Sequence, residues 1–190
     1  MKSPAFIFGK CSLMIVLLTA AFLTACSDKV DESDIYTFKG ETITSYLEKS
    51  ENFTDFAYIL SRVKLSKRSE STIAQLLSAR GNYTVFAPTN DAVQHYLDSV
   101  YQTTDYDITQ IPDSVADYIA RNAIIDCEDL NAYQTTDFNV GTLERTNMDD
   151  RYITVDFDTI NGGNLATIIN NSARIVLPDI EVYNGYIHGV

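Results

Sequence analysis

Two short stretches decide the fold of this 190-residue chain: Tyr83-Thr-Val-Phe-Ala-Pro-Thr-Asn-Asp-Ala-Val93 and, at its end, Asn184-Gly-Tyr-Ile-His-Gly-Val190. In the first, residues 83–87 predict a strand, and Pro88 ends it because proline cannot donate to a strand ladder. Thr89 or Asn90 then supplies the polar side chain that the free N–H groups of a helix start need. In the second, Asn184-Gly185 predicts a tight turn into a strand whose Ile187 and His188 face opposite sides.

The hydrophobic pattern elsewhere predicts helices in the first half and strands in the second. Helical spacing predicts helices around Ile43 and Leu47, from an Asn52 cap to Val63, around Ile73–Leu77, from Thr89 to Val100, and from Pro112 to Ala123. In the last two helices we expect Tyr96, Val100 and Tyr118 to face inward. Alternation over 151–158 predicts a half-buried strand, with further strands over 173–177 and 183–187. This order predicts a single α+β domain over residues 41–190.

The first 25 residues have the order of a secretory signal. Lys2 and Lys10 precede an apolar run from Ser12 to Leu23, which is shorter than the roughly 20 residues that span a membrane. The run ends in Leu23-Thr-Ala-Cys26, which resembles a bacterial lipobox. That resemblance implies a lipoprotein signal peptide over 1–25 and an acylated Cys26 as the new N-terminus. The alternative is an ordinary signal peptide with a chance cysteine.

An acidic stretch follows Cys26 and predicts how the domain is held. Charged residues with few apolar neighbours stay disordered, so we expect residues 26–40 to form a tether behind the lipidated cysteine. Acidic residues at this place also resemble the surface-export signals of some Gram-negative lipoproteins. Several acyl chains hold a protein firmly on a membrane. We therefore expect a lipid anchor in the outer membrane, with the domain at the cell surface.

The charge excludes one class of partner. The chain carries a net charge of −12, and removal of residues 1–25 would leave 165 residues with 12 basic and 26 acidic side chains. A surface this acidic is unsuited to nucleic acid, because phosphates need a basic patch. It is compatible with solubility, cation association or a basic partner. Cys127, between Asp126 and Glu128, is expected to be a partly buried filler, since flanking carboxylates raise a thiol pKa.

Catalytic motifs are missing from the sequence. It contains two histidines and no Gly-x-Ser-x-Gly, Gly-rich phosphate loop, Cys-x-x-Cys or His-Glu-x-x-His. We therefore expect no enzymatic activity, no metal site and no cofactor.

Taken together, the two stretches resemble the signature boxes of the fasciclin domain family, an extracellular adhesion and binding fold. The matching residues are Thr84, Phe86, Ala87, Pro88, Thr89 and Asn90 in the first box, and Asn184, Gly185 and His188 in the second. The resemblance implies a fasciclin-like fold in which helices pack on a small β-sheet core. It also implies that polar groups near the first box hold His188, which makes this histidine a hydrogen-bonded structural residue.

The chain departs from the family pattern after His188. Fasciclin domains continue past this histidine with further strand residues, whereas this sequence stops at Val190. We therefore expect a C-terminally incomplete domain from a longer lipoprotein; the alternative is that something else completes the sheet. If nothing replaces the final strand, a sheet edge is left open.

Two surfaces are candidates for binding. Pro178-Asp179-Ile180 resembles the core of an integrin-contact motif of animal fasciclin proteins, and Tyr183 with His188 resembles the family's tyrosine-histidine adhesion region. The plainer alternative is a turn into a strand, with Ile180 in the core. A second surface is predicted from three tyrosines in polar surroundings, because exposed aromatic rings stack on sugars or proteins; these are Tyr101, Tyr106 and Tyr133.

The sequence thus predicts a surface lipoprotein with an adhesion or binding domain for a protein or extracellular-matrix partner. The alternative is an accessory glycan-binding component of an outer-membrane nutrient-uptake system.

Overall fold

The computed structural model describes residues 40–159 and 165–190. The expected signal peptide over 1–25, the lipidation site Cys26 and the tether as far as residue 39 lie outside the described residues. Within the described ranges, no helix is both long enough and apolar enough to cross a membrane.

The stretches 83–93 and 184–190 form neighbouring strands. The first contains β1 (Tyr83–Ala87), as predicted, and the second contains β8 (Gly185–Gly189). They pair in parallel, residue for residue, from Tyr83 opposite Gly185 to Ala87 opposite Gly189. With β2 (Ile124–Asp126) and β7 (Leu177–Val182), they make a four-stranded sheet in the order β2-β1-β8-β7.

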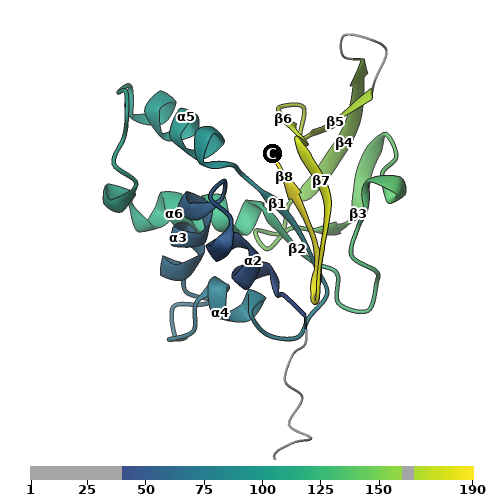
Figure 1. Ribbon diagram of the computed structural model, residues 1–190, viewed down its shortest axis with the longest axis horizontal. Coiled ribbons are helices and arrows are strands. Elements are labelled where there is room, and N and C mark those ends of the chain that lie inside the picture. The colour runs from purple at the N-terminus through teal and green to yellow at the C-terminus, as the bar shows by residue number, and fades with distance from the viewer. Residues whose placement is uncertain (1–39, 160–164) are drawn as a thin grey trace, which may run out of the picture. The chain divides into compact units, whose positions relative to one another are not determined.

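Helices cover one face of this sheet (Figure 1). They are α2 (Ile43–Lys49), α3 (Thr54–Arg62), α4 (Ile73–Leu77), α5 (Asn90–Tyr101) and α6 (Asp113–Asn122), with the short 3₁₀ helix η3 (Ile108–Gln110) before α6. Their apolar stripes meet β1 and β8 in one core, to which Phe56, Leu77, Val85 and Ile187 contribute fully buried side chains.

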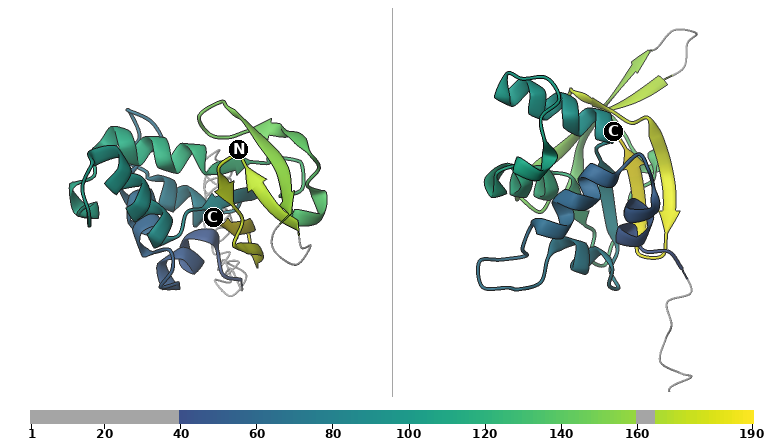
Figure 2. Two further views of the ribbon diagram at one scale, coloured as in Figure 1. Left: turned by 90° about the horizontal axis from the view of Figure 1, so that it is seen from above. Right: turned by 60° about the vertical axis from the view of Figure 1, so that its left-hand side comes forward.

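A second sheet covers part of the other face (Figure 2). Its order is β3 (Gly141–Thr146), β4 (Tyr152–Thr159), β5 (Leu165–Ile169) and β6 (Ala173–Arg174), all antiparallel. Before it, a long connection from β2 carries the 3₁₀ helix η4 (Thr135–Asp137). A smaller core between the sheets contains Phe86, Ile125, Phe138 and Ile153. The predicted α+β class and helix-on-sheet packing are confirmed, and β1 and β8 are buried on both faces.

Several local predictions were wrong for physical reasons. Asn52 does not cap α3, which begins at Thr54 after Phe53. Tyr96, Val100 and Tyr118 are exposed, because the buried faces of α5 and α6 are narrow and use Val93, Leu97, Ala116 and Ala120. The strand expected over 173–177 is divided between β6 and β7, and the strand expected over 183–187 begins at Gly185, after the turn.

The expected open edge is not beside the last strand. Within the described residues, β8 is hydrogen-bonded to β1 on one side and to β7 on the other. The outer strands of this sheet are β2 and β7. Of these two edges, β7 is the strand that carries Pro178, Asp179 and Ile180.

Candidate functional site at strand β7

Polar residues of the first box cap two helices. The Thr89 hydroxyl accepts from the Ala92 N–H across 3.3 Å and caps α5. The Asn90 amide oxygen accepts from the Asp55 N–H across 3.1 Å, and its NH₂ group donates to the Glu51 carbonyl across 2.8 Å. Asn90 therefore accepts from a free N–H group at the start of α3, which is the capping role predicted for Asn52. This role is visible only in three dimensions, since the helix lies far away in sequence.

The other first-box residues belong to the strand and its exit. The buried Thr84 hydroxyl accepts from the Tyr133 N–H across 2.8 Å, and Phe86 lies in the core between the sheets. The Ala87 carbonyl accepts from the Val190 N–H across 2.9 Å, and the half-buried Pro88 follows directly. The structure thus places the whole box in scaffold positions.

Asn184 and Gly185 join the sheet to the helices. The buried Asn184 side chain accepts from the Ile43 N–H across 2.9 Å and donates to the carbonyls of Leu77 and Ala79 across 2.7 and 2.9 Å. It therefore serves the start of α2 and the end of α4 at once. Gly185 has a φ of +144°, and a Cβ there would stand 1.8 Å from the Tyr83 carbonyl oxygen.

His188 is fully buried and hydrogen-bonded through both ring nitrogens. The Asp179 N–H donates to Nδ1 across 3.2 Å, so Nδ1 carries no proton, and the Nε2–H donates to the Tyr133 carbonyl across 2.9 Å. The ring stacks on Phe86 with centroids 5.5 Å apart. Burial lowers the pKa of His188 below its ordinary value. The expected hydrogen bonds are present, and one of them comes from beside the first box: Tyr133, whose carbonyl accepts from His188, donates its N–H to the Thr84 hydroxyl. The first box itself contributes the Phe86 ring.

Asp179 fixes the conformation of β7. The pairing of β7 with β8 shifts register between Leu177 and Ile180, and Asp179 has a left-handed φ of 54° at this bulge. Its carboxylate accepts from the Thr135 N–H across 2.7 Å and from the Thr135 hydroxyl. Because its N–H is used by His188, Asp179 joins β7, β8 and η4. Its carboxylate is already hydrogen-bonded within the domain, whereas a residue that contacts a partner through its carboxylate would need that group unbonded.

The bulge presents an apolar surface next to Asp179. Val176 and Leu177 are 53% and 36% exposed, and Pro178 is also exposed. We call these three residues the β7 edge surface. Ile180 is half-buried against the helical core, as the plainer alternative predicted. Tyr183 is exposed at the other end of β7, where its N–H donates to the Glu41 carbonyl across 2.7 Å. The four predicted adhesion residues therefore do not form one surface, and Val176 was not among the residues predicted to bind.

The tyrosine surface predicted from Tyr101, Tyr106 and Tyr133 does not form. Tyr101 and Tyr106 stack on each other with centroids 4.4 Å apart and pack against the helical core. Tyr133 is half-buried against the core between the sheets. Paired or packed rings offer no free face for a sugar.

The described residues hold no group of His, Cys, Asp and Glu side chains with the geometry of a metal site. Cys127 is fully buried, and burial raises the pKa of its thiol. A buried thiol of raised pKa is a poor nucleophile.

Comparison with known proteins agrees with this geometry. The family model described as "Fasciclin domain" matches residues 51–190. A solved structure of a FAS1 domain pair from the insect cell adhesion molecule Fasciclin I is similar, with a TM-score of 0.56 and 17% sequence identity. The similarity covers 78% of this chain and 48% of that one, so this chain spans about half of the domain pair. Curated proteins gave no significant match.

Proposed function

The chain belongs to the fasciclin domain family, and we propose that it is an adhesion module that contacts a protein or matrix partner through the β7 edge surface. The observation that carries the proposal is the bonding of Asp179 to both Thr135 and His188. These bonds hold the bulge in one conformation, so Val176, Leu177 and Pro178 need little ordering when a partner binds. A surface ordered in advance loses less entropy on association.

The position of β7 supports the same role. It is an outer strand of its sheet, and outer strands present N–H and C=O groups to which another chain can bond. Exposed apolar side chains beside such an edge add contact area that is removed from water on binding. The box residues act in this proposal as scaffold, and the adjacent edge makes the contact.

The proposed location is the outer membrane, with the domain facing outward. The support is the sequence order of a charged segment, an apolar run and Leu23-Thr-Ala-Cys26, followed by acidic residues. Lipid chains such as palmitate on Cys26 would anchor the chain. In this role the protein binds its partner without chemical turnover and needs no cofactor.

Two measurements on intact cells that produce the full chain test this proposal. Proteinase K should digest the domain while a periplasmic control protein stays intact. The same cells should adhere to at least one of immobilised collagen, fibronectin or mucin more than cells without the protein. Protection of the domain from proteinase K would contradict the proposal. So would adhesion to all three coatings that is no greater than that of cells without the protein.

A second candidate is the glycan-binding component of an outer-membrane uptake system. A groove beside α3 and α6 favours it, because this groove gathers Arg62, Lys67 and Arg121 on an otherwise acidic protein. Affinity electrophoresis of the full chain in gels that contain acidic or neutral polysaccharides tests it, and migration unaffected by every polysaccharide would exclude it.

A further inference from the structure

A groove of about 480 Å³ lies among α3, α6 and the loop that follows α3. Its volume is within the range of pockets that hold small ligands, roughly 300–1,000 Å³. Seven of its nine lining residues are charged or carry a hydroxyl, and the other two are Val63 and Ala116. The groove shares no residue with the β7 edge surface.

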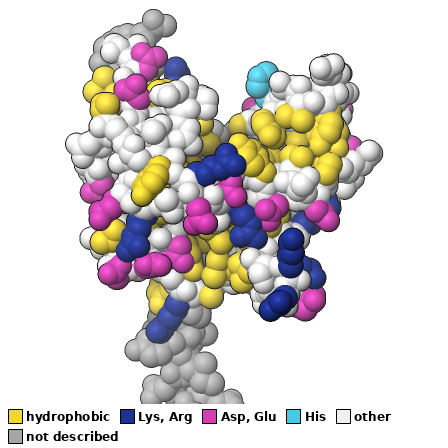
Figure 3. All heavy atoms as spheres, turned by 180° about the vertical axis from the view of Figure 1, so that it is seen from behind, with side chains coloured by type: hydrophobic (Ala, Val, Ile, Leu, Met, Phe, Trp, Pro, Cys, Tyr) yellow, Lys and Arg dark blue, Asp and Glu magenta, His cyan; other side chains and the backbone are white. Residues whose placement is uncertain are grey.

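The charge of the groove opposes that of the protein. Four lining residues are cationic and two are anionic, whereas the whole chain has a net charge of −12. Figure 3 shows basic side chains gathered at the lower right of one face, on which acidic side chains are also frequent. A local excess of positive charge attracts an anion to a protein that otherwise repels anions.

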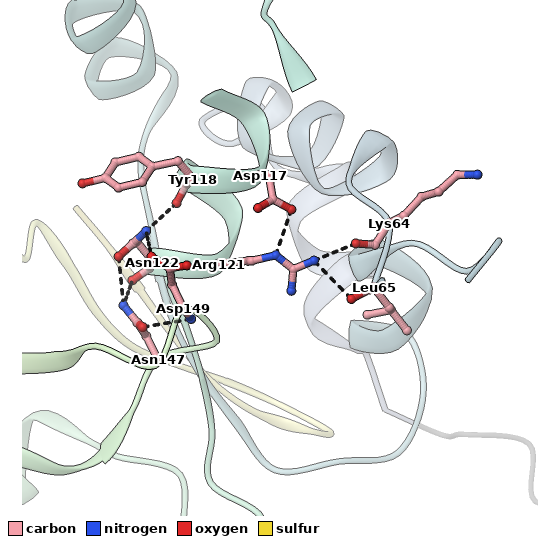
Figure 4. Close-up of polar contacts among 8 residues, drawn as sticks. All are labelled: Lys64, Leu65, Asp117, Tyr118, Arg121, Asn122, Asn147 and Asp149. Atoms are coloured by element: carbon pink, nitrogen blue, oxygen red, sulfur yellow. Dashed lines mark hydrogen bonds and ion pairs between the residues drawn. The ribbon is translucent and has the colours of Figure 1, made fainter. Parts of the chain in front are cut away.

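Arg121 organises one wall of the groove (Figure 4). Its Nε donates to the Asp117 carboxylate across 2.8 Å, and its Nη2 donates to the carbonyls of Lys64 and Leu65 across 2.8 and 3.2 Å. These bonds fix the loop against α6. Nη1 makes no hydrogen bond or ion pair with the described residues, so two N–H donors on a fixed guanidinium remain for a ligand.

Arg62 and Asp113 define a second fixed pair. Arg62 donates to the Ile111 carbonyl across 3.2 Å and to the Asp113 carboxylate across 2.7 Å. Each groove carboxylate thus has an arginine partner that holds it in place. Carboxylates keep further acceptor positions after one such bond. Asp113 and Asp117 can therefore still accept from hydroxyl groups.

Two lysines have ammonium groups that, among the described residues, are unpaired or only weakly paired, so they can bind an anionic ligand. Lys67 makes no hydrogen bond or ion pair within the described ranges. Lys64 pairs with Glu70 across 2.9 Å, and both side chains are at least half exposed. Exposed ion pairs contribute little to stability, because water screens them. An arriving carboxylate therefore displaces Glu70 from Lys64 at small cost.

We propose that this groove binds an acidic saccharide through a uronate unit, whose one carboxylate is surrounded by hydroxyl groups. The carboxylate lies among the cationic side chains that line the groove, and the sugar hydroxyls donate to Asp113 and Asp117. A phosphate or densely sulfated chain fits worse, because the same two aspartates repel it. An acidic peptide also fits worse, because Val63 and Ala116 are small and buried, and peptides rely on large apolar anchors. This inference names the ligand class of the second candidate function and is independent of adhesion through β7.

Calorimetric titration of the full chain tests the site directly. The probes are tetrasaccharides of galacturonate, glucuronate and mannuronate, the methyl ester of each, inorganic phosphate and a poly-glutamate peptide. Each methyl ester is the matched probe, since it keeps the hydroxyls and loses the charge. The variants are Lys67→Gln and, as matched control, Lys49→Gln, which makes the same change at the exposed Lys49–Glu41 pair.

We expect at least one uronate tetrasaccharide to bind, with affinity lowered about tenfold or more by methyl esterification. Lys67→Gln should weaken binding about three- to tenfold, and Lys49→Gln should leave it unchanged. Absence of binding to all three uronates, equal binding of the methyl ester, equal effects of both lysine variants, or tighter binding of phosphate or poly-glutamate would overturn the proposal. None of these results depends on whether cells adhere.

Discussion

The backbone N–H of Asp179 donates to Nδ1 of His188 across 3.2 Å and fixes the neutral, Nε2-protonated form of the buried ring. This bond connects the end of the second box to the bulge that shapes the β7 edge surface. A residue buried in the sheet is thereby bonded to the bulge of its exposed neighbouring strand.

Acid should destabilise the domain through His188. Burial lowers its folded-state pKa below the ordinary value of 6.5. As pH falls through 6.5, the unfolded chain therefore binds a proton that the folded domain does not, and the free energy of unfolding decreases until the folded-state pKa is passed. His188→Gln removes this proton uptake, because glutamine does not titrate. Urea unfolding at pH 8 and pH 5 should show a smaller loss for His188→Gln than for the parent, and equal losses would contradict the assignment.

Asp179→Ala should destabilise the domain by about 1–3 kcal/mol. The change removes the acceptor of two Thr135 bonds and places alanine at a left-handed φ that aspartate tolerates better. Urea denaturation measures this loss. Glu181→Ala, on the exposed face of the same strand, is the control and should stay within about 0.5 kcal/mol of the parent. Equal stability of the two variants would show that the bulge does not need Asp179.

Gly185→Ala should prevent stable folding, whereas Gly141→Ala should not. Both glycines have left-handed φ values, of +144° and +133°. A Cβ at Gly185 collides with the Tyr83 backbone, but at Gly141 it meets open space. The Gly141 variant should lose only about 1 kcal/mol, from backbone strain. Thermal unfolding separates the two, and similar melting temperatures would argue against the close approach of β1 and β8.

Asn184→Asp should be more damaging than Asn184→Ala. Alanine leaves the Ile43 N–H and two carbonyls without their buried partner, at a cost of about 3 kcal/mol. Aspartate keeps the acceptor for Ile43 but turns a carboxylate oxygen toward the carbonyls of Leu77 and Ala79. Repulsion and burial of charge then add to the loss. Urea midpoints in the order parent, Ala, Asp are expected, and an aspartate variant as stable as the parent would contradict the bonding of Asn184.

The sequence predicted local structure well where a residue type has one predominant structural role. Pro88 ends β1, Thr89 caps α5, and Asn184-Gly185 forms the turn before β8. It failed where a side chain serves a distant element, as when Asn90 caps α3. No local pattern shows such a contact, because the partner lies on another part of the chain.

The candidate site was predicted only in part for the same reason. Pro178 and Asp179 were found from a motif, but Asp179 is bonded within the domain by Thr135, which no spacing rule connects to it. Tyr183 was predicted as an adhesion residue from its resemblance, with His188, to the family's tyrosine-histidine region, and the length of β7 separates it from Pro178. Arg121 was not identified at all, since its role depends on carbonyl groups in a loop beside α3.

The most direct test of the central claim compares the adhesion of cells producing Val176→Ser with that of cells producing Val140→Ser. Both variants make the same change at an exposed valine, 53% exposed on the β7 edge surface and 69% exposed before β3. With equal surface amounts and urea midpoints, we expect Val176→Ser to lower adhesion severalfold and Val140→Ser to leave it unchanged. Equal adhesion of both variants would contradict the β7 edge surface as the contact site.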